Sequence, residues 1–474
     1  MVGHRLAGAP LDFAALRSEL EVPGEFRPDV LAEAAEVAKS PILPDDDATD
    51  IPFVTVDPAG SRDLDQAVHI GRSAGGGYLI SYAIADVAAF VRPGSALDAE
   101  AMRRGETLYF PDQRVPLHPQ PLSEGAASLL PGELRPAVLW QIALDSTGNV
   151  VRVDVRRARV RSRQQLHYPG LQRAVDVGTP PDAVALLPEV GVLRQQLARR
   201  RHAIDLDLPE QIVAGDAQHG WTLAFRAQLP VETYNAEISL LTGTCAASLM
   251  LQANYGILRT VPPPDHGTVA ALRRIAPALD VDWAEGALPG DVLATLDRTK
   301  SEHVAFLDHA ASLLHGSSYT AFDGAGPSQP LHAGVAAPYA HVTAPLRRLV
   351  DRYGSEICLA AQANQPVPDW VRTRVPQLPQ TMEQADRRAH EVDRAVVDLI
   401  EAWLLAGRIG QTFRATVLAA DEKAATIAVD EPAVRARCSG ADLPVGQRVG
   451  VRLVAADTAS RTVRFELAQP HRHP

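Results

Sequence analysis

Three aspartates in the segment 51–67 have a spacing that suits a metal ion. A β-rich apolar run ends in Asp57, a turn rich in Pro, Gly and Ser follows, and Asp63 and Asp65 then lie two residues apart on one face of an extended segment. Carboxylates that converge on one turn suit a hard divalent cation such as Mg²⁺, and such an ion supports phosphodiester hydrolysis. Because Asp and Glu make up 57 of the 474 residues, the spacing alone favours a solvated turn.

Further blocks stand in a fixed order along the chain, and they reverse that preference. With the run 56–67 they are Tyr82–Val87, Phe90–Ser95, Arg104–Pro111, Val115–Leu117, Ala203–Glu210 and Thr343–Arg348. Together they resemble the RNB exoribonucleases, the family of ribonuclease II and ribonuclease R, over residues 45–410 and a C-terminal tail. Because several ordered blocks over that length leave little room for accident, the chain is identified as a member of this family.

The resemblance implies a metal centre held by Asp57, Asp63 and Asp65, and we expect the loss of Asp65 to be the most damaging. Two divalent ions about 4 Å apart can stabilise the attacking and the leaving oxygen of a phosphodiester. The fourth family position is an aspartate, and here it is Gln66. Because an amide oxygen can ligate a metal but carries no charge, we expect one Mg²⁺ or Mn²⁺ ion to bind more weakly, or Asp86 to substitute.

The resemblance also implies residues that bind RNA. Arg347, followed by Arg348, matches a position that contacts phosphate, where a guanidinium can make bidentate hydrogen bonds. Tyr109 matches the aromatic residue that stacks on the 3′-terminal nucleotide, although a core tyrosine at a strand end is an open alternative. The partner aromatic aligns near Val261, so we expect a one-sided base clamp. Asp393 stands where the family often has glutamate, and it is carried over as an RNA-binding residue.

Composition is that of an ordinary globular protein. Hydrophobic residues make up 46% and charged residues 22% of the chain, and no apolar run reaches the ~18 residues that span a bilayer. Without a signal-peptide pattern, and with Cys245, Cys358 and Cys438 far apart, we expect a cytoplasmic, monomeric protein without a disulfide framework or zinc site. The net charge of −11 argues against a surface coated in basic residues but not against a basic channel.

The chain divides into three expected parts within an α+β fold. Residues 1–45 contain two short helical patterns, which form either a helix-turn-helix unit or an arm packed on the main domain. Residues 46–407 form the catalytic domain, implied by the family to be a mixed sheet surrounded by helices, with helices predicted over 236–253, 301–314, 345–362 and 382–405. The acidic motif starts near residue 57, which leaves no room for the two cold-shock barrels typical of the family. We therefore expect RNA with a short single-stranded tail to be accepted better than by relatives that carry these barrels.

Residues 408–474 form a predicted β-barrel. Short runs of alternating polarity at regular spacing, divided by turn residues, are typical of a five-stranded OB-fold. Such barrels commonly stack bases on aromatic side chains, but this one has only Phe413 and Phe465. Its grip on RNA is therefore predicted to be mainly electrostatic.

The resemblance implies a hydrolytic 3′→5′ exoribonuclease that releases nucleoside 5′-monophosphates from single-stranded RNA. One alternative is an RNB-like RNA-binding protein that Gln66 has weakened catalytically; it would protect RNA without shortening it. A second alternative is a metal-dependent phosphodiesterase that acts on small nucleotides or DNA.

Overall fold

The computed structural model describes residues 11–73, 75–216, 220–421, 423–440 and 443–468. Its largest sheet has six strands in the order β7-β6-β3-β2-β1-β8, with neighbours antiparallel except for the parallel pair β1 and β8. These strands are β1 (Val54–Asp57), β2 (Gln66–Arg72), β3 (Tyr78–Ala85), β6 (Leu134–Leu144), β7 (Val150–Arg161) and β8 (Gln164–His167). Asp57 is therefore the last residue of one strand, and Gln66 is the first residue of its antiparallel neighbour.

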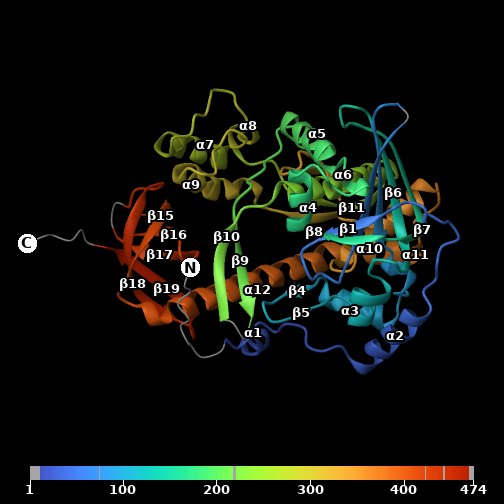
Figure 1. The fold of residues 1–474 in the computed structure, drawn as a ribbon, viewed down its shortest axis with the longest axis horizontal. Coiled ribbons are helices and arrows are strands. Elements are labelled where there is room, and N and C mark those ends of the chain that lie inside the picture. The colour runs from blue at the N-terminus through green and yellow to red at the C-terminus, as the bar shows by residue number, and fades with distance from the viewer. Residues whose placement is uncertain (1–10, 74, 217–219, 422, 441–442, 469–474) are drawn as a thin grey trace, which may run out of the picture.

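Helices pack on this sheet and build the main hydrophobic core (Figure 1). The core joins sheet residues such as Tyr82 and Trp140 to Met250 and Tyr353, which come from two of these helices. The helices of this region are α4 (Tyr168–Asp176), α5 (Leu187–Arg200), α6 (Pro230–Gln252), α10 (Leu349–Gln362), α11 (Asp369–Arg374) and α12 (Leu378–Leu405). Helix α6 is buried along much of its length, because apolar and small residues occupy all of its faces.

The N-terminal helices pack on different parts of this body. Helix α1 (Phe13–Glu19) begins after Asp12, whose side chain accepts a hydrogen bond from Ala15 N at 3.0 Å. It lies against α12, whereas α2 (Pro28–Lys39), which starts with a proline in its first turn, lies against α3 (Ala96–Arg104). Each helix thus contributes to a separate contact with the catalytic region.

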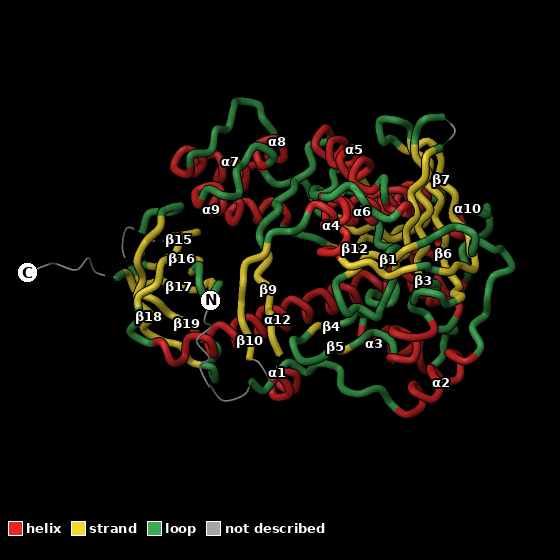
Figure 2. The backbone as a smooth tube through the Cα atoms, in the orientation of Figure 1, coloured by secondary structure: helices red, strands yellow, loops and turns green. Residues whose placement is uncertain are grey.

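Four two-stranded sheets and three further helices complete the region. Their strands are β4 (Leu108–Tyr109) with β5 (Arg114–Val115), β9 (Glu210–Asp216) with β10 (Gly220–Arg226), β11 (Tyr255–Thr260) with β12 (Ser318–Asp323), and β13 (Leu331–His332) with β14 (Ala337–Pro338). The helices are α7 (His266–Ile275), α8 (Pro289–Leu293) and α9 (Ser301–Ala310). The hairpin β9–β10 lies between the six-stranded sheet and the C-terminal barrel, beside α12 (Figure 2).

The C-terminal strands form a closed barrel in the order β15-β16-β17-β19-β18. They are β15 (Thr412–Ala420), β16 (Ala424–Val429), β17 (Val434–Ser439), β18 (Arg448–Asp457) and β19 (Thr462–Leu467). The barrel packs on α9 and on α12, the long helix that reaches it from the catalytic region (Figure 1). The predicted α+β fold with a five-stranded C-terminal barrel is therefore confirmed. Among the described helices, none is both long and apolar enough to span a membrane.

Candidate active site

The turn between β1 and β2 is fixed by a second segment of the chain. The Ser128 hydroxyl donates a hydrogen bond to Arg62 O at 2.6 Å and accepts one from Leu64 N at 2.9 Å. On the same stretch, Leu129 N donates to Leu64 O, and Ala85 N of β3 donates to Asp65 O. These bonds hold the backbone from residue 62 to residue 65, so the aspartates of this turn are presented on a rigid support.

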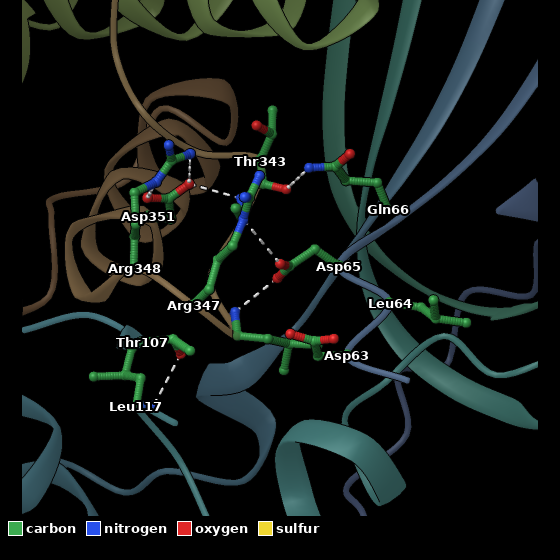
Figure 3. Close-up of polar contacts among 12 residues, drawn as sticks. Asp63, Leu64, Asp65, Gln66, Thr107, Leu117, Thr343, Arg347, Arg348 and Asp351 are labelled. Atoms are coloured by element: carbon green, nitrogen blue, oxygen red, sulfur yellow. Dashed lines mark hydrogen bonds and ion pairs between the residues drawn. The ribbon is translucent and has the colours of Figure 1, made fainter. Parts of the chain in front are cut away.

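Asp65 is buried where this turn meets the segment before α10. Its side chain is 7% exposed, and its Oδ1 accepts a hydrogen bond from Leu346 N at 2.7 Å. Its Oδ2 lies 3.7 Å from Nε of Arg347, whose side chain is 47% exposed (Figure 3). Two segments that are 281 residues apart in the chain therefore meet at this one carboxylate.

The segment before α10 is itself held by a buried aspartate. Ala344 N donates to Asp351 Oδ1 at 2.7 Å, and Arg348 donates from Nε and Nη2 to the two oxygens of Asp351 at 2.9 and 3.0 Å. Arg348 is thus engaged in a bidentate ion pair, whereas the neighbouring Arg347 points toward Asp65 (Figure 3). Of the two arginines that the sequence predicts to bind RNA, Arg347 has the freer guanidinium.

Two of the three aspartates have strongly raised pKa values. Burial raises the pKa of Asp65 to about 8, although Arg347 and the Leu346 amide oppose the shift. Burial, followed by repulsion from Asp63, raises the pKa of Asp57 to about 7. Oδ2 of Asp57 is also buried without a hydrogen-bond partner among the described residues. A cation at this turn would reduce the repulsion between Asp57 and Asp63 and would give Oδ2 of Asp57 a partner.

Gln66 acts as a bridge between β2 and the segment before α10. Its Nε2 donates to Thr343 O at 2.5 Å, and its Oε1 accepts from the Tyr82 hydroxyl at 2.9 Å. The Tyr82 hydroxyl in turn lies 2.8 Å from the Ser239 hydroxyl. Both ends of the Gln66 amide therefore have protein partners, and its role as a metal ligand stays a prediction.

Asp63 is paired with Arg114, a residue that the sequence analysis missed. Nη1 of Arg114 lies 2.6 Å from Asp63 Oδ1. Arg114 stands opposite Tyr109 in the β4–β5 hairpin, and Tyr109 is 44% exposed. Burial around the Tyr109 hydroxyl, with the nearby charge of Asp63, raises its pKa to about 12. No sequence signal singles out Arg114, because its partner lies 51 residues away in the chain.

Three other predicted positions lie in different surroundings. Asp86 is 3% exposed and accepts a hydrogen bond from Nε of Arg157 at 2.7 Å, so this buried carboxylate is already engaged in an ion pair. Asp393 lines a groove of about 580 Å³ between α12 and the barrel, and burial raises its pKa. Val261 is 2% exposed and pairs with His332 in an isolated bridge.

The donor chemistry at the β1–β2 turn fits a divalent metal ion. Asp57, Asp63 and Asp65 offer the hard oxygen ligands that Mg²⁺ and Mn²⁺ take, and Asp57 has an oxygen without a partner among the described residues. Within the described ranges, however, no three His, Cys, Asp or Glu side chains are already arranged to hold an ion. The ion pair between Asp63 and Arg114 commits one of the three carboxylates to a guanidinium.

Comparison with family models places the chain in a known family. The model of the RNB domain matches residues 46–359, and the model of the RNase II-type exonuclease C-terminal S1 domain matches residues 411–468. The chain therefore belongs to the RNB family, which confirms the resemblance seen in its sequence.

Individual relatives have low sequence identity to this chain. Ribonuclease R of Thermotoga maritima is 25% identical over 424 residues, which are 85% of this chain and 59% of that protein. The chain spans about three-fifths of the length of such curated relatives.

Solved structures share the fold. The structure of Mycoplasma genitalium RNase R in complex with ribose methylated single-stranded RNA matches 96% of this chain and 77% of its own with a TM-score of 0.85, at 20% identity. Yeast Ssd1, described as a pseudonuclease, matches 88% of this chain and 52% of its own with a TM-score of 0.68, at 18% identity. At these identities the likeness establishes the fold alone.

Proposed function

We propose that this protein is a 3′→5′ exoribonuclease that hydrolyses single-stranded RNA to nucleoside 5′-monophosphates with Mg²⁺ or Mn²⁺. The observation that carries the proposal is the meeting of the aspartate-bearing β1–β2 turn with Arg347, whose Nε lies 3.7 Å from Asp65 Oδ2. Membership of the RNB family and the name of the Thermotoga maritima relative support the same activity.

Asp57, Asp63 and Asp65 would hold the metal, which when bound supplies charge neutralisation and a water molecule of lowered pKa. The Leu346 amide fixes the orientation of the Asp65 carboxylate through its 2.7 Å hydrogen bond. Because Arg347 is half-exposed and only loosely paired, its guanidinium can turn to a phosphate and balance the charge that develops there.

Tyr109 is the proposed contact for the terminal base. Tyr109 is 44% exposed, and its strand partner Arg114 contacts Asp63. An exposed ring next to the reacting phosphodiester can stack on any base, which fits degradation without sequence preference. The base clamp stays predicted to be one-sided, since the side chain at Val261 is a buried valine.

The barrel is proposed to hold the incoming strand through charge. Phe413 and Phe465 are 6% and 0% exposed and pack edge-to-face in the barrel core with ring centroids 5.7 Å apart. They are therefore not available for stacking. The groove between α12 and the barrel is lined by Arg394, Arg435, Arg437 and Arg461, which can contact phosphates.

One alternative has its own supporting observations. Gln66 replaces a carboxylate of the family pattern, both ends of its amide are engaged by Thr343 and Tyr82, and Ssd1, a pseudonuclease, shares the fold. In this alternative, the protein binds and protects RNA without shortening it.

The test is incubation with 5′-labelled single-stranded RNA in Mg²⁺ or EDTA. The proposal predicts a metal-dependent ladder that shortens from the 3′ end, with no ladder for Asp65→Asn and an unchanged one for Asp50→Asn, an exposed aspartate nearby. Tight binding of RNA that stays intact in both Mg²⁺ and Mn²⁺ would establish the alternative instead. A DNA oligomer of the same sequence, degraded equally well, would point to a general phosphodiesterase.

A further inference from the structure

One of the three proposed metal ligands, Asp63, already forms an ion pair with an arginine side chain. Asp63 Oδ1 lies 2.6 Å from Nη1 of Arg114, with the two side chains 16% and 33% exposed. In the described part of the chain, the one ion pair of Asp65 is its 3.7 Å contact with Arg347, and Asp57 has no ion pair. Asp63 is therefore the ligand that a metal ion would have to share or take over.

Arg114 is delivered to Asp63 by a well-anchored hairpin. Phe110 N donates to Gln113 O at 2.9 Å, which closes the β4–β5 turn. At the tip of the turn, Asp112 pairs with Arg17 of α1 at 2.8 Å, and the Arg17 guanidinium lies 5.1 Å from the centre of the Phe110 ring. Because the hairpin is held from outside, the guanidinium of Arg114 is kept next to the aspartates.

A second acceptor lies near the same nitrogen atom of Arg114. Nη1 of Arg114 is 3.9 Å from Oε1 of Glu124, a residue of the short helix η2 (Leu122–Ala126). The other oxygen of Glu124 accepts a hydrogen bond from Gln120 Nε2 at 3.1 Å, so the carboxylate is oriented but not neutralised. A small rotation of the Arg114 side chain would move it from Asp63 to Glu124 without leaving its charge unpaired.

We propose that Arg114 is a tethered cation that competes with the divalent metal ion for Asp63, and that Glu124 receives Arg114 when the metal binds. The proposal rests on the proposed function for the identity of the metal site. A carboxylate oxygen at 2.6 Å from a guanidinium cannot at the same time be an inner ligand of Mg²⁺ without strong repulsion between the two cations. Arg114 thus lowers the affinity of the free protein for metal, and Glu124 limits that loss.

The test measures Mg²⁺ binding to the purified full chain by isothermal titration calorimetry, without RNA. Arg114→Gln should bind Mg²⁺ about 3- to 10-fold more tightly than the unaltered protein, the size expected from one partly exposed ion pair. Glu124→Gln should bind it more weakly, because Arg114 then has Asp63 as its only close acceptor among the described side chains. The two substitutions act in opposite directions, which general damage to the fold would not produce.

The matched control is Arg72→Gln, which removes the same charge from an ion pair of the same 2.6 Å length, with Glu189, on the exposed end of β2. It should leave Mg²⁺ affinity unchanged. Equal or weaker binding by Arg114→Gln, or a gain of the same size in Arg72→Gln, would overturn the proposal.

The outcomes also separate this inference from the proposed function. Tighter binding by Arg114→Gln with RNA left intact would support the role of Arg114 and contradict the exonuclease. If RNA is shortened but Arg114→Gln and the unaltered protein bind Mg²⁺ with the same affinity, the role of Arg114 is contradicted and the exonuclease is not. Absence of Mg²⁺ binding in both proteins, and equally in Asp65→Asn, would contradict the tethered cation together with the metal site.

Discussion

At the six-stranded sheet, buried carboxylates lie close together with few partners, whereas on the C-terminal barrel exposed arginines pair with neighbouring acids. Asp57 and Asp65 have pKa values raised to about 7 and 8, while Arg437 pairs with Asp421 at 3.1 Å with both side chains more than half exposed. This difference indicates at which of the two regions a bound ligand would relieve unfavourable interactions. A cation at the sheet would relieve unfavourable burial, but a phosphate at the barrel only replaces weak surface pairs.

The largest expected effect is on catalysis at the β1–β2 turn of the six-stranded sheet. Arg347→Gln should reduce the rate of RNA shortening about 10²- to 10³-fold, because it removes the half-exposed guanidinium proposed to balance charge on the phosphate. Mg²⁺ affinity should not fall, since the aspartates remain and a neighbouring positive charge is removed. Single-turnover rates beside the exposed control Arg92→Gln would measure this, and a rate within a factor of a few of the unaltered protein would remove Arg347 from the mechanism.

The next effect is on stability in the same region. Gln66→Asp would restore the acidic family pattern but lose the hydrogen bond from Gln66 Nε2 to Thr343 O. We expect a loss of about 1 to 3 kcal/mol in the free energy of unfolding, because a carbonyl loses its donor and faces a carboxylate. Urea denaturation, with Gln365→Asp at an exposed site as the control, measures it. Unchanged stability with tighter Mg²⁺ binding would show that residue 66 is a ligand position and not a bridge.

A pH effect is expected where α12 meets the barrel. Burial raises the pKa of Glu401 from its ordinary value of 4.5 to about 7, although Arg435 N and Gln211 donate hydrogen bonds to it. The unfolded chain ionises Glu401 at lower pH than the folded chain, so folding loses stability as the pH rises from about 4.5 to 7. Glu401→Gln keeps the acceptor oxygen and removes the charge.

Glu401→Gln should therefore match the unaltered protein at pH 4 to 5 and exceed its unfolding free energy by about 1 to 3 kcal/mol at pH 8. Denaturation curves at the two pH values test this. A stability difference that does not change with pH would mean that Glu401 has the same pKa in the folded and the unfolded chain, which would weaken the contrast between buried and exposed charges.

The smallest effect is expected on the barrel. Arg437→Ala removes one exposed arginine of the groove beside α12 and its 3.1 Å ion pair with Asp421. Unfolding free energy should change by less than about 0.5 kcal/mol, and the affinity for single-stranded RNA should fall a few-fold, with the salt slope of binding reduced by about 1. Filter binding at several salt concentrations measures both. If the RNA affinity of Arg437→Ala fell by as large a factor as the catalytic rate of Arg347→Gln, the proposed difference between the sheet and the barrel would be contradicted.

Much of the fold was predictable because it depends on local patterns. The helix predicted over 382–405 is α12, Leu378–Leu405, and the alternating runs after residue 408 form the closed barrel. The helix predicted over 345–362 begins instead at Leu349, because the preceding residues leave the helical path to direct backbone amides at two aspartates. Tertiary hydrogen bonds outweighed helix propensity there.

The site was predictable only through the acidic spacing and the family resemblance. The spacing predicts that Asp57, Asp63 and Asp65 converge on one turn; the structure has Asp57 as the last residue of β1 and Asp63 and Asp65 in the connection to β2. The partners that control these residues come from far away in the chain: Arg114 is 51 residues from Asp63, and Thr343 is 277 residues from Gln66. Local sequence patterns carry no information about such contacts. The ion pair of Arg114 with Asp63 and the hydrogen bond from Gln66 to Thr343 could therefore be found only in the structure.

The most direct test of the central claim uses RNA with a single labelled phosphate between its last two nucleotides. With Mg²⁺, we expect release of a labelled nucleoside 5′-monophosphate as the first product, and no release from Asp65→Asn although that variant still binds the RNA. Label that stays on full-length RNA, or that is released equally by Asp65→Asn, would contradict the claim that the β1–β2 turn is the active site of a 3′→5′ exoribonuclease.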